Sequence, residues 1–204
     1  MDDSYLTIAN PSVREIKVKG SRFIARTSLA QSVSEARTQL EQIQKEEYSA
    51  THNCYAYRIG TPTAQPEFKY SDDGEPNGTA GRPIYDVICG AGVTNVLLVV
   101  TRYFGGTKLG TGGLVKAYSE AALLAMKDSG TRENFITDCL RVGIDFSVYD
   151  SLKKAISRYG AKEIEADFSD KVSLRIEIRR SLTEALITDI TELSKGKASI
   201  ERIL

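Results

Sequence analysis

Apolar residues cluster most densely between residues 95 and 126. Residues 95–100 read NVLLVV, a continuous apolar run that is typical of a strand buried on both faces. Residues 114–126 read LVKAYSEAALLAM, where apolar residues recur at intervals of three and four, and this predicts a helix with one buried face. We expect that face to consist of Leu114, Val115, Tyr118, Ala121, Ala122, Ala125 and Met126. Ser129 and Gly130 then predict the end of the helix.

Upstream of this segment the pattern predicts a hairpin, a helix and a strand. Charged residues alternate with apolar ones over residues 15–19, Gly20-Ser21 offers a turn, and strand-like sequence continues to residue 27. A capping-box pattern at Ser32 precedes an apolar stripe, which predicts a helix over residues 33–47. The aromatic-rich residues 53–59 predict a further strand. We expect residues 1–11 to form only a loosely held lead-in.

A long polar segment occupies residues 61–83. It contains three of the five prolines before Pro83 and shows no periodicity, so we interpret it as a loop of the kind that often carries function. Asp73-Gly74 and Asn77-Gly78 are turn dipeptides within it. Thr79 is expected to cap a short helix whose first turn contains Pro83.

The pattern restarts after Gly130. Strict alternation predicts a strand whose buried residues are Leu140, Val142, Ile144 and Phe146. The remaining elements are predicted as a helix over residues 148–159, strands over 161–166 and 172–178, a helix over 182–193 and a strand over 198–203. This βαββαβ order fits a ferredoxin-like sandwich. We therefore predict an α+β protein with a boundary near Thr131, giving domains of residues 1–131 and 132–204.

The loop between the buried strand and the long helix is the strongest hint of function. It holds two cations, Arg102 and Lys108, and the glycines Gly105, Gly106, Gly110, Gly112 and Gly113. The first N–H groups of a helix lack partners within the helix, so this segment resembles an anion site. It matches neither the Walker A pattern nor GxGxxG. Two interpretations remain open: contact with a phosphate-like anion, or glycines that only let loop pack on loop.

Further candidate residues surround this loop in the sequence. The only histidine, His52, shares one face of an extended chain with Cys54, which suits either a nucleophilic pair or plain packing. The acidic cluster of residues 71–76 could bind a cation, act as acid or base, or pair with Arg82, Arg102 and Lys108, and we favour the last, structural role. We expect the cleft to be lined by His52, Cys54, Asp72, Asp73, Glu75, Arg82 and Tyr103.

Composition narrows the classes of protein. The formal net charge is +0, from 27 basic and 27 acidic residues, which argues against a non-specific polyanion binder but permits a local basic patch. The three cysteines form no CxxC pair, so neither a disulfide framework nor a zinc finger is supported. No stretch approaches the roughly 18 apolar residues of a membrane span. We expect a cytoplasmic protein with no metal, no cofactor and no membrane partner.

Four segments resemble the YigZ/IMPACT family. They are GSRFIA at residues 20–25, HNCYAYRIG at 52–60, SDDGEPNGTAGRPI at 71–84, and NVLLVVTRYFGGTKLGTGGLVKAY at 95–118. These long, gapless motifs cover the first predicted domain. The βαββαβ order that follows looks like the second domain of the bacterial YigZ branch. The additional N-terminal domain of eukaryotic members is not expected here.

The resemblance implies a fold and a class of partner. The family's first domain is ribosomal-protein-like, with a β-α-β arrangement also found in domain IV of elongation factor G, and the second resembles domain V of that factor. Because both relatives contact RNA, the resemblance suggests a binding protein that regulates translation through RNA, the ribosome or a protein partner, although a fold does not fix a function. The alternative is an enzyme that acts on a small phosphorylated or acidic ligand in the Arg102/Lys108 cleft. The resemblance supplies no catalytic residues.

Overall fold

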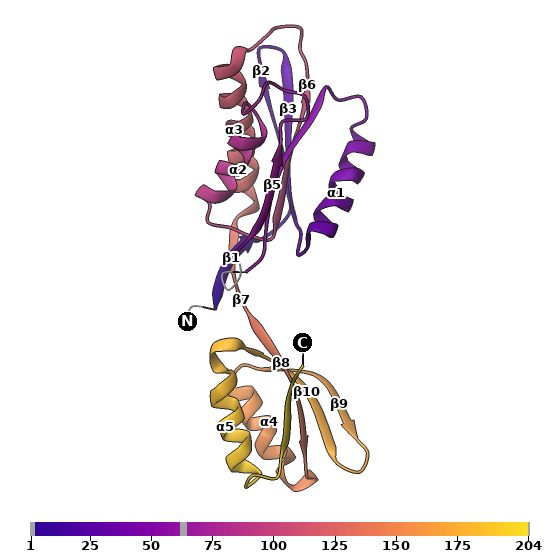
Figure 1. The fold of residues 1–204 in the computed structure, drawn as a ribbon, viewed down its shortest axis with the longest axis vertical. Helices are drawn as coiled ribbons and strands as arrows, with labels where there is room; N and C mark the ends of the chain where they lie inside the picture. The colour runs from indigo at the N-terminus through magenta and orange to yellow at the C-terminus, as the bar shows by residue number, and fades with distance from the viewer. Residues whose placement is uncertain (1–2, 62–64, 204) are drawn as a thin grey trace. The chain divides into compact units, whose positions relative to one another are not determined.

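A computed structural model describes residues 3–61 and 65–203 of the chain. These residues divide into two units (Figure 1). The large unit comprises residues 5–134, and the small unit comprises residues 135–203 together with residues 3 and 4. The large unit contains the glycine loop and all the candidate site residues.

A five-stranded antiparallel sheet forms the centre of the large unit. Its strands are β2 (Ser12–Val18), β3 (Ser21–Leu29), β6 (Val96–Tyr103), β4 (His52–Ile59) and β5 (Glu67–Ser71), in that spatial order. β6 lies in the middle, and its residues are buried up to Arg102. The continuous apolar run at residues 95–100 predicted this two-sided burial, because every side chain of a covered central strand faces a core.

Helices cover both faces of this sheet (Figure 1). α2 (Gly81–Gly90) and α3 (Gly110–Ser129) pack on one face, and α1 (Val33–Glu46) packs on the other. α1 begins as predicted, since the Ser32 hydroxyl accepts the N–H of Glu35 at 3.1 Å. Six of the seven residues predicted for the buried face of α3 are buried, and the seventh, Val115, is 38% exposed.

The hairpin of β2 and β3 is confirmed, but its turn lies one residue earlier than predicted. Val18 pairs with Ser21, which leaves Lys19 and Gly20 as the two turn residues. Both have positive φ angles, +46° and +84°, as the tight two-residue turns of β-hairpins require. The glycine therefore takes the second turn position, and Ser21 is already in the strand.

The N-terminal segment is a strand, so the expectation of a loosely held lead-in is wrong. β1 (Ser4–Ile8) pairs with β7 (Thr131–Phe135) in a two-stranded sheet. Ile8 is fully buried, and the carboxylate of Asp3 accepts hydrogen bonds from Arg179 and from the N–H of Ser181. A run of only five residues before a proline gives too short a pattern to identify, and its partner strand lies more than a hundred residues away.

The segment 61–83 is also more ordered than predicted. Residues 67–71 form the edge strand β5, which pairs with β4, while residues 62–64 lie outside the described residues. The rings of Phe68 and Tyr70 pack against Tyr85 of α2, with centroids 4.9 and 5.8 Å apart. An edge strand with mostly exposed side chains lacks the apolar alternation on which strand prediction depends.

The small unit has the predicted βαββαβ order. Its elements are β8 (Thr137–Ile144), α4 (Tyr149–Arg158), β9 (Lys162–Phe168), β10 (Val172–Arg179), α5 (Thr183–Leu193) and β11 (Ser199–Ile203). The sheet is antiparallel with strand order β11-β8-β10-β9, and both helices lie on one face of it (Figure 1). Phe146 is not the last buried residue of β8, because it starts a 3₁₀ turn and is exposed.

No helix among the described residues is both long and apolar enough to cross a membrane.

Candidate functional site

A cavity of about 400 Å³ lies beside the N-terminus of α3. It forms where β4 begins and β6 ends, since His52 of β4 pairs with Arg102 of β6. We call it the glycine-loop cavity. It is lined by Thr51, His52, Glu75, Pro76, Arg102, Phe104, Lys108, Leu109, Gly110, Thr111 and Leu114. The fold thus brings together Glu75 of the acidic segment, the only histidine and the glycine loop. Five other residues expected in the cleft do not line this cavity: Cys54, Asp72, Asp73, Arg82 and Tyr103.

Arg102 is occupied by an internal ion pair at the base of this cavity. Its Nη1 lies 2.5 Å from Oε1 of Glu75, and the two side chains are only 7% and 3% exposed. The hydroxyl of Tyr118 donates to the same carboxylate oxygen at 2.8 Å. The guanidinium also lies over the rings of Phe23 and Phe104. Arg102 is therefore neutralised from within the protein, although its Nε has no hydrogen-bond partner among the described residues.

His52 presents one ring nitrogen to the cavity. Its Nδ1 lies 2.7 Å from the carbonyl oxygen of Asp73, and a carbonyl oxygen only accepts hydrogen bonds, so Nδ1 carries the proton. Nε2 then faces Glu75, 3.9 Å from its Oε1. The neutral ring offers an acceptor at Nε2, and the protonated ring would add a second donor there.

Cys54 lies on the same face of β4 as His52, but it is buried and does not line the cavity. Its Sγ lies 3.0 Å from the carbonyl oxygen of Asp72 and 3.4 Å from the hydroxyl of Tyr118, and the residue is fully buried. Burial raises the pKa of the Cys54 thiol far above its ordinary value, and burial raises the pKa of Tyr118 in the same way. Both groups stay protonated, so this geometry offers no support for Cys54 as a nucleophile.

The two aspartates of the acidic segment bind backbone N–H groups. Oδ1 of Asp72 accepts from Ala80 and Gly81, and its Oδ2 accepts from Gly78, all at 2.9 Å. Oδ2 of Asp73 accepts the N–H of Asn53 at 2.6 Å. Within residues 3–61 and 65–203, no cluster of three or more His, Cys, Asp or Glu side chains has the arrangement of a metal site.

Asp72, and not Thr79, caps α2. The helix begins at Gly81, and no side chain of its N-cap residue Ala80 caps it. The Thr79 hydroxyl instead donates to the carbonyl of Pro76 at 2.6 Å. The prediction failed because the capping carboxylate comes from eight residues upstream, a separation that the local capping rules do not consider.

Arg82 and Tyr103 lie outside the glycine-loop cavity. Arg82 projects from α2 and pairs with Asp86 one turn further on, with both side chains more than half exposed. The Tyr103 hydroxyl donates to the Glu47 carboxylate. That bond keeps Tyr103 next to the C-cap residue of α1, on the sheet face opposite Arg102.

The glycines of the loop serve two purposes. A Cβ on Gly105 would lie 1.9 Å from the carbonyl carbon of Gly20, so this position lets the loop pack on the β2–β3 turn. Gly106 and Gly110 have φ angles of +85° and +73°, which favour glycine. Gly112 and Gly113 lie in the first turn of α3, where Gly112 has open space beside it. The contact of Gly105 with Gly20 matches loop-on-loop packing, whereas contact with an anion stays a prediction.

Lys108 differs from Arg102 in being exposed. It forms no ion pair with any residue in 3–61 or 65–203, and it lies next to Leu109, the N-cap residue of α3, whose side chain gives no capping bond. Sequence reasoning missed Tyr118 as part of the site. A tyrosine hydroxyl within an alanine-rich buried stripe was the available signal for Tyr118, because a buried hydroxyl needs a partner.

Two family models match the chain. The Impact N-terminal domain matches residues 19–126, and Domain of unknown function (DUF1949) matches residues 142–197. The chain is 34% identical over 200 residues to IMPACT family member YvyE of Bacillus subtilis, covering 97% of the chain and 90% of that protein. It is 30% identical over 198 residues to IMPACT family member YigZ of Escherichia coli, covering 97% of both. A crystal structure of a hypothetical protein has a TM-score of 0.73 at 29% identity and covers 100% of this chain and 99% of that one.

Proposed function

Because the chain belongs to the IMPACT family, we propose that it is a binding protein linked to the regulation of translation, with RNA, alone or in the ribosome, as the partner of the glycine-loop end. Its large unit would be the ribosomal-protein-like domain, related to domain IV of elongation factor G. Its small unit would be the ferredoxin-like domain, an assignment that the strand order β11-β8-β10-β9 supports. The boundary that we propose, near residue 131, lies at the start of β7 and three residues before the end of the large unit. The three free cysteines support a cytoplasmic location.

The observation that supports this proposal is the distribution of charge around the glycine loop. The carboxylate of Glu75 is paired with Arg102, and those of Asp72 and Asp73 bind backbone N–H groups. The exposed charge that remains in the glycine loop is Lys108, and it lies beside the N-terminus of α3, which no side chain caps. A phosphate group is the ligand that such a combination attracts.

Two lysines stand at this end without an ion pair among the described residues. Lys108 is in the glycine loop, and Lys19 is in the β2–β3 turn, where the adjacent Gly20 packs against Gly105. They project from two segments that are in direct contact. A nucleic-acid backbone carries repeated phosphates, so it would engage both lysines at once.

Salt-dependent binding tests this function. We expect the full chain to bind single-stranded RNA and purified ribosomes at low salt. Replacing both Lys19 and Lys108 with alanine should weaken binding by about tenfold and lower the slope of log affinity against log salt by about 1.4, the contribution of two phosphate contacts. Lys162→Ala with Lys197→Ala, which removes two exposed lysines from the small unit, is the matched control. Absence of salt-sensitive binding to either probe would refute the proposal.

A second candidate is an enzyme that acts on a small phosphorylated or acidic ligand. It is favoured by the size of the glycine-loop cavity, about 400 Å³, which lies in the range of small-molecule sites and exposes His52 Nε2, Lys108 and the helix N-terminus together. Thermal shift with inorganic phosphate and sugar phosphates, on the wild type and on His52→Ala, distinguishes the two. Stabilisation that depends on His52, without RNA binding, would favour the enzyme.

A protein partner is the third outcome of these tests. If affinity purification recovered one protein whose retention did not change after nuclease treatment, and purified RNA did not bind, the proposed RNA partner would be wrong. The family assignment would remain unaffected, because it depends on sequence similarity over almost the whole chain.

A further inference from the structure

The outward face of α3 is apolar where solvent would favour polar residues. Val115, Leu123 and Leu124 are 38%, 57% and 39% exposed, while the opposite face of the helix is packed into the core. A cluster of large apolar side chains that are exposed to solvent usually marks an interaction surface. This face is distinct from the glycine-loop end, which adjoins only the first turn of the helix.

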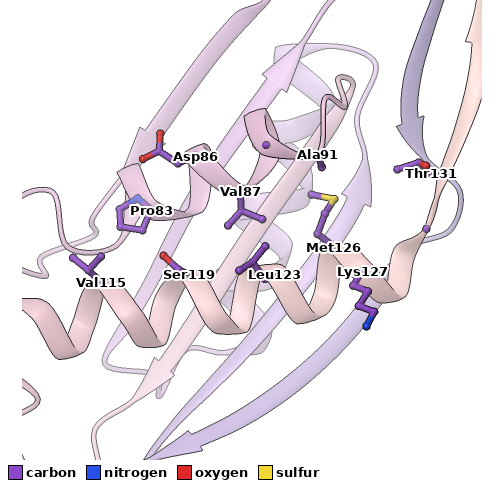
Figure 2. Close-up of a pocket in the computed structure, with 12 residues that line it drawn as sticks. Pro83, Asp86, Val87, Ala91, Val115, Ser119, Leu123, Met126, Lys127 and Thr131 are labelled. Atoms are coloured by element: carbon purple, nitrogen blue, oxygen red, sulfur yellow. The ribbon is translucent and has the colours of Figure 1, made fainter.

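Grooves run along both sides of this face. One of about 750 Å³ lies between α2 and α3, and Figure 2 shows Val115, Ser119 and Leu123 of α3 opposite Pro83 and Val87 of α2. The other, of about 650 Å³, is lined by Leu124, Leu123 and Ile16 of β2. Leu123 borders both grooves. The outer side of α3 is therefore a ridge with a depression on each flank, which suits packing against another ridge.

Two charged residues frame the leucines. Glu120 and Lys127 are exposed, and neither forms an ion pair with another residue of the described ranges. Residues 120–127 read EAALLAMK, so Glu120, Leu123, Leu124 and Lys127 have the i, i+3, i+4, i+7 spacing of one helix face. In this segment an acid stands three residues before the leucine pair, and a base stands three residues after it.

We propose that this face docks onto the same face of a second copy of the chain, with the two α3 helices antiparallel about a two-fold axis between Leu123 and Leu124. Reversing one helix places Leu123 opposite Leu124 of the second copy, and Glu120 opposite Lys127 of the second copy. Both pairs occur twice in the dimer, as an isologous interface requires. A parallel arrangement would instead place Glu120 beside Glu120 of the second copy and Lys127 beside Lys127 of the second copy, and like charges repel each other.

Reversing the charge of Glu120 or of Lys127 tests the proposal, with analytical ultracentrifugation of the full chain as the measurement. We expect the wild type to dimerise, and Glu120→Lys or Lys127→Glu to weaken dimerisation by about tenfold, because each change turns two attractive pairs into two repulsive ones. An equimolar mixture of the two variants should recover the wild-type association, since all charges of one copy then face opposite charges. The double variant carrying both changes should recover it as well.

Apolar variants check the centre of the interface. Leu123→Glu should abolish the dimer, while Leu193→Glu, at a helix residue of the small unit with 40% exposure, should leave it intact. Thermal melts of each variant establish that the fold is retained. A wild type that stays monomeric at its highest soluble concentration would overturn the proposal and leave this face to a different protein. A dimer that neither charge reversal weakens, or that the mixture does not restore, would also overturn it.

Discussion

The two units differ in whether a connected group of polar side chains lies within the core. The centre of the large unit contains a connected polar group of four residues, Arg102, Glu75, Tyr118 and Cys54. The core of the small unit is apolar, built from alternate residues of its strands packed on α4 and α5. Removing charged groups from water is costly unless they are paired and hydrogen-bonded. Stability alone would therefore favour an apolar core, such as that of the small unit.

This difference supports placing the proposed site in the large unit. The buried polar group fixes the walls of the glycine-loop cavity, because Glu75 accepts from Arg102 and Tyr118 and also faces His52. In the small unit the polar contacts lie at the ends of elements, such as the bond from the Thr183 hydroxyl to Asp138. An apolar core of that kind stabilises a fold but positions no chemistry. The comparison yields three predictions, in order of decreasing effect.

Breaking the buried ion pair should have the largest effect. Glu75→Ala leaves the Arg102 guanidinium buried without a counterion, and we expect a loss of about 3–5 kcal/mol in the free energy of unfolding of the large unit. Arg158→Ala in the small unit removes a pair with Asp189 in which the arginine is 65% exposed, and should cost less than about 1 kcal/mol. Urea unfolding, with hydrogen exchange to separate the units, measures both.

A double variant sharpens this result. Glu75→Leu combined with Arg102→Met replaces the pair with apolar side chains of similar length, and should recover most of the stability lost in Glu75→Ala. The same variant should alter ligand or RNA binding at the glycine-loop cavity, because the cavity loses its polar wall. If Glu75→Ala were no more harmful than Arg158→Ala, the buried pair would not organise the large unit.

The sequence predicted those parts of the fold in which a long periodic pattern decides the structure. β6 and α3 are such elements, and so is the alternation of Leu140, Val142 and Ile144 in β8. Short elements whose order depends on distant partners were not predictable: β1 is held by β7, and β5 is an exposed edge strand. Local patterns contain no information about these partners.

The candidate site was predictable only in part, because two of the seven residues expected to line the cleft, His52 and Glu75, line the cavity. His52, Glu75, Arg102 and Lys108 do meet at one cavity. Yet the sequence did not show that Arg102 is neutralised while Lys108 stays free, because the distinction depends on which side chain reaches Glu75 in space. Asp72 illustrates the same limit, since a carboxylate that caps a helix from eight residues upstream has no local signature.

The second prediction concerns how helices begin in the two units. α2 is capped by the Asp72 carboxylate, whereas α4 and α5 follow 3₁₀ turns without a side-chain cap. Asp72→Ala should therefore cost about 1–2 kcal/mol and increase hydrogen exchange in α2. Thr79→Ala, at the residue that local rules favour as the cap, should have the smaller effect. The reverse order would show that Asp72 is not the effective cap.

The third prediction concerns how the stability of each unit depends on pH. Its expected effect near neutral pH is the smallest of the three. Burial raises the pKa of Cys54 and of Tyr118 above their ordinary values of 9.0 and 10.0. The unfolded chain therefore loses these protons first, so the large unit should have its full stability below about pH 9 and lose it as the pH rises further. In the small unit, hydrogen bonds from Arg179 lower the pKa of Asp3 below its ordinary value of 3.8.

The sign is opposite for Asp3. Its contribution is complete above the unfolded pKa of 3.8 and declines as the pH falls through the lower, folded pKa, so acid should weaken the small unit. Hydrogen exchange measured at pH 3, 7 and 10 follows both units in one experiment. Cys54→Ala should flatten the alkaline loss in the large unit, and Asp3→Asn should flatten the acid loss in the small unit. Because each variant removes one titrating group from one unit, equal responses of both units to either variant would contradict the assignment of alkaline sensitivity to the buried polar group.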